Sequence, residues 1–272
     1  MELQVNGAKT YCYTGGKAFD AAKPTVVFVH GALNDHSVWA LQSRYMANHG
    51  WNVLAVDLPG HCRSQGEAPS TVEEAAEFIV ALADAAGLQK LALVGHSMGA
   101  LIALEAAGRL KDRVTHLVLI GIAYPMRVSP ALLEASLKDP IRALEMDNVF
   151  SRSTLAAPPS LLGPGTWVYG VNMALGRRVL ASNPGADLYY RDFKACDSYT
   201  GALEAVSTLT CPVLFLLGAV DQMTPPKSAQ ALIDLANKTG KIVKVVYVPV
   251  GHRQMSEAPD QTLFAIQGFL GS

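Results

Sequence analysis

The sequence predicts an α/β protein with a mostly parallel sheet, and three observations support that prediction. Six short apolar segments recur along the 272 residues, and helical patterns separate them. Strands that alternate with helices in this way are typical of βαβ units. The composition agrees, because 50 % of the residues are hydrophobic and only 17 % are charged, against about 25 % charged residues in an ordinary domain. Parallel strands that helices cover on both faces require such apolar runs.

The expected strands begin with a hairpin. Asn6-Gly7 separates two short segments, and both residues tolerate the positive φ angles of a tight turn. The later strands are nearly continuous runs of Val, Leu and Ile. They are expected at Thr25–His30, Asn52–Asp57, Leu91–Gly95, Thr115–Ile120, Pro212–Gly218 and Lys241–Val248.

Helical patterns fill the links between these strands. Ser70 and Glu73 occupy the positions of a capping box before one of them, and Gly87 follows as a stop signal. Pro226 stands in the first turn of another, where a missing N–H costs nothing. The expected helices are Ser37–His49, Val72–Ala86, Met98–Leu110, Pro226–Lys238 and Pro259–Leu270.

One interval, from about Ala123 to about Leu209, contains no convincing strand. It holds broken helical patterns, such as Ala131–Lys138 and Ile141–Phe150, and the uncharged run Ser153–Gly176. Such an interval is too long for a link between two strands of a compact domain. We therefore predict an α/β core made of residues 1–122 and 210–272, and a helical cap insertion at 123–209 that folds over one end of the sheet.

Several classes of protein are excluded by composition and motifs. The formal net charge is −1 without a block of like charges, which argues against a nucleic-acid partner. Pro158, Pro159 and Pro164 interrupt the uncharged run, so we expect no membrane span there. Four widely spaced cysteines favour free thiols in a reducing compartment, and no secretory signal is visible, so we expect a cytoplasmic protein. No metal cluster, phosphate loop or dinucleotide fingerprint is visible, so no cofactor or metal is expected, whereas monomer and homodimer both stay open.

Gly95-His96-Ser97-Met98-Gly99 is the sharpest motif of the chain. It follows the apolar run Leu91–Val94 and opens a helical pattern, which is the strand–turn–helix context of a G-x-S-x-G nucleophile elbow. The turn is so tight that residues two positions from the serine must be small, and Gly95 and Gly99 meet that need. Since the turn aims the hydroxyl of Ser97 outward, we interpret Ser97 as a nucleophile.

A serine nucleophile needs a base, and the base needs an acid that orients it. The chain order that this architecture requires is serine, acid, histidine. Asp221 follows the strand at Pro212–Gly218, and His252 follows the strand at Lys241–Val248. Carboxyl ends of parallel strands meet at one edge of the sheet, where ligands bind. The sequence therefore predicts that Ser97, Asp221 and His252 converge.

Other acids and histidines compete with this assignment. Asp57 also ends a strand, but it precedes the serine, and we interpret it as a residue that orders its loop. His30 precedes the serine as well and is expected to be packed and hydrogen-bonded. Asp192 and Asp197 are weaker candidates than Asp221 for the acid.

The reaction of a carbonyl group with Ser97 creates an oxyanion, which preorganised N–H donors must stabilise. One expected donor is the backbone amide of Met98, the residue after the nucleophile. The other should come from the loop after the first parallel strand, where we choose the amide of Ala32.

By these residues the chain resembles the α/β-hydrolase superfamily over about residues 20–270, as a serine esterase-like member with a helical cap. The motifs that carry the resemblance are His30-Gly31-Ala32 with Trp39, Asp57-Leu58-Pro59-Gly60-His61 with Arg63-Ser64, the elbow at Ser97, and Asp221 with Gly251-His252. The resemblance implies an eight-stranded, mostly parallel sheet flanked by helices, with the cap inserted after the sixth strand. Cys62 departs from the pattern, because relatives usually have glycine there.

These observations together predict a hydrolase that cleaves a small, largely apolar carboxylic ester or lactone through an acyl-enzyme intermediate. The predicted substrate pocket contains His96, Leu33, Trp167, Met173 and Met223, and Leu161 and Leu162 are expected in its roof. Three alternative hypotheses stay open at this point: carbon–carbon hydrolysis of a ring-cleavage product, acyl transfer on the same three residues, and a small-molecule receptor that retains them.

Overall fold

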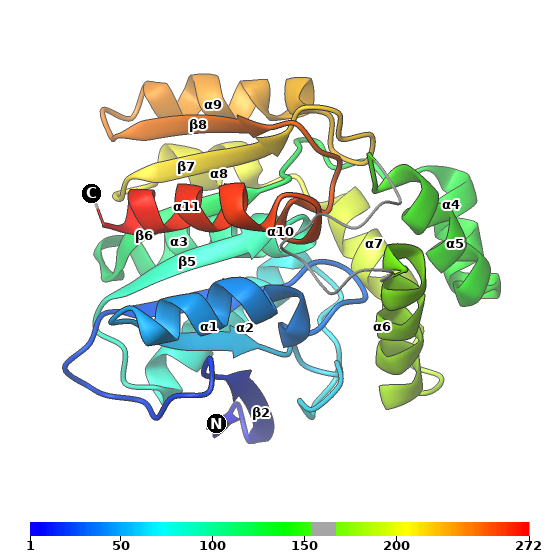
Figure 1. Cartoon of the computed structure of the whole chain (residues 1–272), viewed down its shortest axis with the longest axis horizontal. Coiled ribbons are helices and arrows are strands. Elements are labelled where there is room, and N and C mark those ends of the chain that lie inside the picture. Colours follow the sequence, from blue (N-terminus) through cyan, green and yellow to red (C-terminus); the bar gives the residue numbers. More distant parts are fainter. Residues whose placement is uncertain (154–166, 272) are drawn as a thin grey trace.

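The computed structural model of the protein describes residues 1–153 and 167–271, and Figure 1 shows its arrangement. An eight-stranded sheet forms the centre, in the order β1-β2-β4-β3-β5-β6-β7-β8. The predicted hairpin and all six later strands are present. The strands are β1 (Glu2–Val5), β2 (Ala8–Tyr13), β3 (Thr25–Val29), β4 (Asn52–Val56), β5 (Leu91–His96), β6 (Val114–Ile120), β7 (Val213–Gly218) and β8 (Val243–Val248).

The sheet is mostly parallel, as predicted. β1 and β2 pair antiparallel, β2 joins β4 antiparallel, and every pair from β4 to β8 is parallel. All residues of β3, β4, β5 and β7 are buried. Apart from Thr25, Asn52 and His96 their residues are apolar, as expected for strands that helices cover on both faces.

The helices follow the predicted positions, with two of them opening as 3₁₀ turns. The helices of the core are α1 (Ala40–Asn48), α2 (Val72–Ala85), α3 (Met98–Leu110), α8 (Ala202–Ser207), α9 (Gln230–Asn237), α10 (Gln254–Glu257) and α11 (Pro259–Leu270). The 3₁₀ turns are η1 (His36–Trp39), η2 (Lys111–Arg113) and η3 (Pro226–Ala229).

The cap of α2 is one residue later than we predicted. Thr71, not Ser70, is the N-cap residue, and its hydroxyl accepts a hydrogen bond from the amide of Glu74 at 3.1 Å. The Glu74 carboxylate in turn accepts from the amide of Ser70 at 2.7 Å. The two side chains thus pair the amide of Glu74 in the first turn and the amide of Ser70 just before the N-cap residue.

Neighbouring residues of each strand belong to two different apolar layers. Val27 and Val29 of β3 pack in the layer that contains α2, α3, α8 and α9. Val26 and Phe28 pack in the other layer, with α1 and α11. This alternation is the period of two expected for a strand with both faces covered.

The insert between β6 and β7 contains helices and loops but no strand in its described part. α4 (Pro130–Lys138), α5 (Pro140–Phe150), α6 (Val168–Ser182) and α7 (Leu188–Ser198) share a third apolar cluster, and we call these four helices the cap. Figure 1 shows the cap beside the edge where β5, β7 and β8 end. α8 falls within the predicted insertion at 123–209, but it packs between α3 and α9 on the sheet.

The crossing of α3 over β3 depends on a glycine. A Cβ at Gly99 would collide with the carbonyl oxygens of Val29 and His30, which are backbone atoms and cannot turn away. Gly268 offers a contrast, because it lies exposed in α11 with nothing within 4 Å of an added Cβ.

We therefore expect Gly99→Ala and Gly268→Ala to have opposite effects on the free energy of unfolding in urea. Gly99→Ala should lower it by about 1–3 kcal/mol or more, because a packed core has no room for the methyl group. Gly268→Ala should raise it by roughly 0.5–1 kcal/mol through the helix preference of alanine. A Gly99→Ala protein as stable as the wild type would contradict this packing.

Candidate active site

Ser97 stands at a sharp turn between β5 and α3. Its backbone dihedrals are φ 55° and ψ −120°, a combination that residues other than glycine rarely adopt. The turn is held by a hydrogen bond from the amide of Ser97 to the carbonyl of Ile120 on β6, at 2.9 Å. A Cβ at Gly95 would collide with the carbonyl of Gly99. The need for small residues on both sides of Ser97 is thus confirmed.

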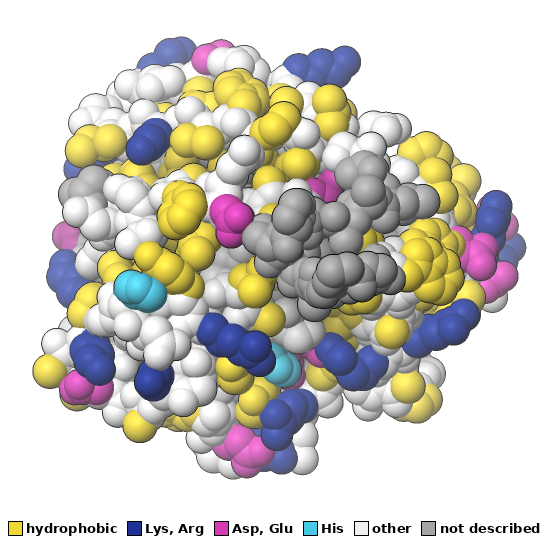
Figure 2. Space-filling view, viewed as in Figure 1, with side chains coloured by type: hydrophobic (Ala, Val, Ile, Leu, Met, Phe, Trp, Pro, Cys, Tyr) yellow, Lys and Arg dark blue, Asp and Glu magenta, His cyan; other side chains and the backbone are white. Residues whose placement is uncertain are grey.

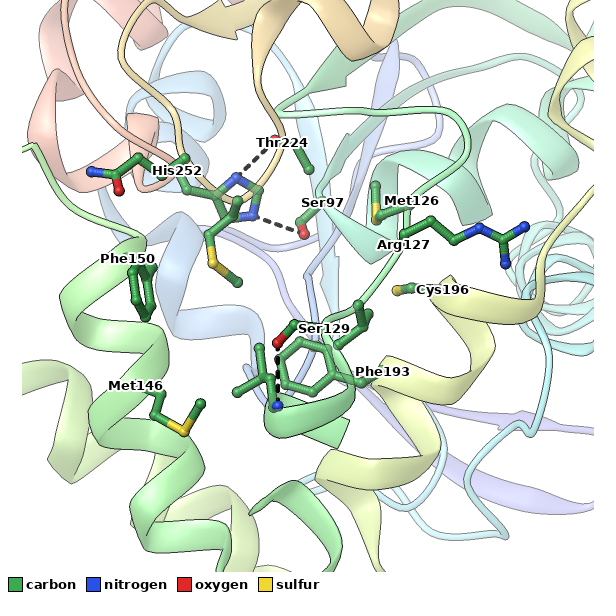
Figure 3. Close-up of a pocket in the computed structure, with 15 residues that line it drawn as sticks. Ser97, Met126, Arg127, Ser129, Met146, Phe150, Phe193, Cys196, Thr224 and His252 are labelled. Carbon is green, nitrogen blue, oxygen red and sulfur yellow. Dashed lines mark hydrogen bonds between the residues drawn. The ribbon is translucent and has the colours of Figure 1, made fainter. Parts of the chain in front are cut away.

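The structure brings Ser97, His252 and Asp221 together in one hydrogen-bonded chain. Nδ1 of His252 lies 2.8 Å from Oδ2 of Asp221, and Nε2 of His252 lies 2.9 Å from Oγ of Ser97. A carboxylate only accepts hydrogen bonds, so Nδ1 carries the ring proton. Nε2 is then the acceptor that faces the hydroxyl of Ser97 (Figure 3).

Asp221 is buried and is held as a carboxylate. Burial alone would raise its pKa, but His252 and the surrounding donors lower the pKa below its ordinary value. Oδ1 accepts from the amides of Met223 and Thr224, each at 2.8 Å. Oδ2 accepts from the hydroxyl of Thr224 at 2.7 Å.

Thr224 is a site residue that the sequence analysis missed. Its Oγ1 also lies 3.0 Å from Nδ1 of His252, so one hydroxyl contacts both the acid and the base. The available signal was a threonine three residues after the acid, at the start of the turn that leads to Pro225 and Pro226. That signal is common in loops and does not by itself reveal the contact with His252.

The two backbone amides predicted as oxyanion donors belong to residues near Ser97. Met98 is the first residue of α3, and Ala32 lines the same cavity as Ser97. Among the described residues, neither amide has a hydrogen-bond acceptor in the protein. His30 fixes the loop of Ala32, since its Nε2 accepts from the amide of Leu58 at 3.1 Å and its Nδ1 therefore donates to the carbonyl of Gly31 at 2.9 Å.

A cavity of about 290 Å³ opens above Ser97 and His252. Figure 3 shows cap side chains around it, with Phe150 and Met146 from α5 and Phe193 from α7. The loop before α4 adds Met126 and Val128. Among the described residues, Arg127 is the one Lys, Arg, Asp or Glu side chain in the lining, and its guanidinium donates to the carbonyl of Asp197 at 2.9 Å. The walls are therefore mostly apolar.

Of the five residues predicted for the substrate pocket, Met223 lies in the described lining of this cavity, and the other four lie elsewhere. Leu33 and Met173 pack inside the apolar cluster of the cap. Trp167 is 66 % exposed at the start of α6 and stacks on Tyr169. The ring of His96 is buried, and its Nε2 donates to the carbonyl of His252 at 2.7 Å.

Trp167 is an exposed residue outside the described lining of the pocket. Figure 2 shows hydrophobic side chains gathered over the cap, next to the residues that are not described. Leu161 and Leu162, which we expected in the roof, lie outside the described residues.

The competing acids have other partners in the structure. Oδ1 of Asp57 accepts from the amide of His36 at 2.8 Å, and Oδ2 accepts from the amide of Arg63 at 3.2 Å, so its predicted role in ordering the loop is confirmed. Asp192 on α7 accepts from the amide of Leu33 at 2.8 Å and lies 3.1 Å from Nε2 of His61. Burial alone would lower the pKa of His61, but the charge of Asp192 raises it above its ordinary value.

One group of side chains has the composition of a metal site. Possible ligand atoms of Asp35, His36 and Asp57 lie within 4.8 Å of one another. These atoms already have partners, because Asp57 contacts His36 at 2.8 Å and Asp35 pairs with Arg178 at 2.6 Å. We assign no cofactor or metal to this group.

Comparison with known proteins places the chain in a family. Residues 24–259 match the sequence model described as "alpha/beta hydrolase fold", and the chain belongs to that family. This confirms the resemblance inferred from the motifs. The first curated relatives that match are longer proteins, of which the chain covers 26–28 % at 33–36 % identity.

A relative of similar length is the non-heme chloroperoxidase of Streptomyces lividans, which is 29 % identical over 256 residues, covering 86 % of this chain and 87 % of that protein. Two solved structures share the fold over the whole chain. The enol-lactonase of Burkholderia xenovorans LB400 has a TM-score of 0.81 at 19 % identity and is covered completely. An esterase of Exiguobacterium antarcticum has a TM-score of 0.82 at 19 % identity and is covered to 99 %.

Within the described ranges, every helix is too short or too polar to cross a bilayer.

The buried His30 predicts a loss of stability in acid. Burial and the neighbouring His61 lower the pKa of His30 to about 4, whereas an unfolded histidine titrates near 6.5. Between these values the unfolded chain binds a proton that the folded chain does not, so stability falls as the pH drops from about 6.5 to about 4. From pH 7 to pH 5 the loss should be about 2 kcal/mol.

Urea unfolding of the wild type and of His30→Gln at both pH values measures this loss. Glutamine keeps a donor and an acceptor but cannot titrate, so the variant should lose less stability in acid by about that amount. The same pH dependence in both proteins would show that His30 is not the group responsible.

Proposed function

We propose that the protein is a serine hydrolase that cleaves small, largely apolar carboxylic esters or lactones through an acyl-enzyme intermediate. The observation that carries the proposal is the hydrogen-bonded chain from Asp221 through His252 to Ser97, placed at the base of an apolar cavity. Membership of the α/β hydrolase family supports it. The names of an enol-lactonase and an esterase among proteins of the same fold agree with this class of substrate.

The first half of the reaction forms the acyl-enzyme. Oγ of Ser97 attacks the carbonyl carbon of the substrate, and its proton passes to Nε2 of His252. The carbonyl oxygen becomes an oxyanion, which the amides of Met98 and Ala32 stabilise. When the intermediate collapses, the alkoxide leaving group takes the proton from His252, and the acyl group stays on Ser97.

The second half returns the enzyme to its starting state. A water molecule gives a proton to Nε2 of His252 and attacks the acyl carbon, which passes through a second oxyanion at the same amides. The carboxylic acid then leaves, and Ser97 regains its proton. Throughout both halves the ionised Asp221 holds the ring with its proton on Nδ1 and stabilises the imidazolium that forms at each step.

The cavity supports a preference for apolar substrates. Its described walls carry Met, Leu, Val and Phe side chains and a single formal charge, on Arg127. At about 290 Å³ the cavity lies near the lower end of small-molecule sites. A positively charged acyl group would lose its hydration there without gaining an ion pair, because the described lining offers no carboxylate.

We expect Ser97→Ala to lower kcat/KM for short p-nitrophenyl esters by at least about 10³-fold, because the nucleophile is lost. Asp221→Asn should cost about 10³–10⁴-fold, because the ring of His252 then adopts the wrong tautomer. Steady-state kinetics with p-nitrophenyl butanoate measures both effects.

Ser207→Ala serves as the control for a serine substitution, because Ser207 lies exposed at the end of α8, and among the described residues its hydroxyl bonds to the carbonyl of Glu204 alone. Equal turnover by Ser97→Ala and the wild type would contradict the mechanism. Cleavage of a vinylogous diketone by a protein that hydrolyses no ester would contradict the substrate class.

A further inference from the structure

Arg253, the residue after His252, connects three separate parts of the molecule. Its Nη2 pairs with a carboxylate oxygen of Asp147 on α5. Its Nε donates to the hydroxyl of Ser151 at 3.4 Å, and its Nη1 donates to Oδ1 of Asn34 at 3.3 Å. The side chains of Arg253 and Asp147 are only 11 % and 8 % exposed. This buried pair therefore joins the cap, the loop of His252 and the loop after β3.

The contact with Asn34 leads directly to a proposed oxyanion donor. Nδ2 of Asn34 donates to the carbonyl of Ala32 at 3.0 Å, and its backbone amide donates to the carbonyl of Gly31 at 3.3 Å. The guanidinium thus orients the side chain of Asn34, which in turn fixes the peptide next to the amide of Ala32. Asn34 is itself buried, so water does not replace this contact.

The end of α5 also holds the backbone of His252. The amide of His252 donates to the carbonyl of Ser151 at 2.7 Å. A Cβ on Gly251 would lie 2.8 Å from both the carbonyl oxygen of Ser151 and the amide nitrogen of Ser153, so the two segments touch backbone to backbone. The base therefore rests on a segment of the insert, although its ring faces residues of the core.

Glu257 makes a second connection between the loop of His252 and the segment that follows α5. Oε1 of Glu257 accepts from the amide of Arg253 at 3.2 Å. Oε2 of Glu257 accepts from the amide and the hydroxyl of Ser153, at 2.7 Å and 2.5 Å. Arg253 and Glu257 thus both bind the loop of His252 to residues 147–153.

We propose that Arg253 is a positioning residue, whose pairing with Asp147 sets His252 and the amide of Ala32 in their reactive places when α5 is docked on the core. The proposal rests on the function proposed above, since it assigns the base and the oxyanion donor to those residues. Arginine suits the task because its planar fork offers donors in several fixed directions, whereas lysine offers one point charge. The loss of this contact affects the reacting groups more than the apolar walls that bind the substrate.

The test compares Arg253→Met, Arg253→Lys and Asp147→Asn with the wild type, using p-nitrophenyl butanoate. Arg253→Met should lower kcat about 10- to 100-fold and change KM less than about threefold, because transition-state contacts are lost and ground-state binding is kept. Arg253→Lys should recover part of kcat. The double variant Arg253→Met/Asp147→Asn should be no slower than Arg253→Met alone, because the two residues act as one unit.

Arg191→Met is the matched control, because Arg191 also joins the cap to the core, through an ion pair with Glu67 at 2.9 Å. It should keep kcat within about twofold. Circular dichroism and urea unfolding show whether Arg253→Met folds. If it does not, kcat and KM of Arg253→Lys and Asp147→Asn are compared with the wild type instead.

The proposal is overturned if kcat stays unchanged in the Arg253 variants, or if KM rises tenfold at constant kcat. It is also overturned if Arg191→Met slows kcat as much as Arg253→Met does, since any loosened cap would then have the same effect. These outcomes differ from a failure of the proposed function, in which Ser97→Ala itself would retain activity.

Discussion

The strained backbone of Ser97 is the constraint on which the remaining geometry depends. A residue with a side chain held at φ 55° and ψ −120° costs on the order of 1–3 kcal/mol. The structure sustains this strain through the bond to Ile120 and through the absence of side chains at Gly95 and Gly99. Because of this turn, the hydroxyl of Ser97 points from the end of β5 toward the loops that follow β7 and β8, where Asp221 and His252 lie.

Much of the core could be predicted from the sequence because its elements depend on local pattern. Continuous apolar runs identify buried parallel strands, and the order of Ser97, Asp221 and His252 follows from strand ends that share one edge. The N-cap of α2 was wrong by one residue because Ser70 and Thr71 both offer a hydroxyl. Only the dihedrals of the first turn decide that Thr71 bonds to Glu74.

The pocket was harder to predict, since the cap is a small core of its own. Met146 and Met173 are both apolar residues of cap helices, yet Met146 lines the cavity whereas Met173 is buried in the apolar cluster of the cap. A helical pattern shows which residues avoid water, but not which of two apolar surroundings they enter. The contacts of Arg253 with Asp147 and Asn34 span 106 and 219 residues of chain, and no local pattern encodes them.

The proposed reaction requires the transfer of an acyl group to Ser97. Mass spectrometry of protein mixed with p-nitrophenyl butanoate and quenched in acid within milliseconds can detect this acyl group. We expect a mass increase of one butanoyl group, located on the tryptic peptide 91–109, in which Ser97 is the one hydroxyl or thiol side chain. The Ser97→Ala protein should carry no such group. Turnover with no adduct, or with the acyl group on a different peptide, would rule out Ser97 as the nucleophile.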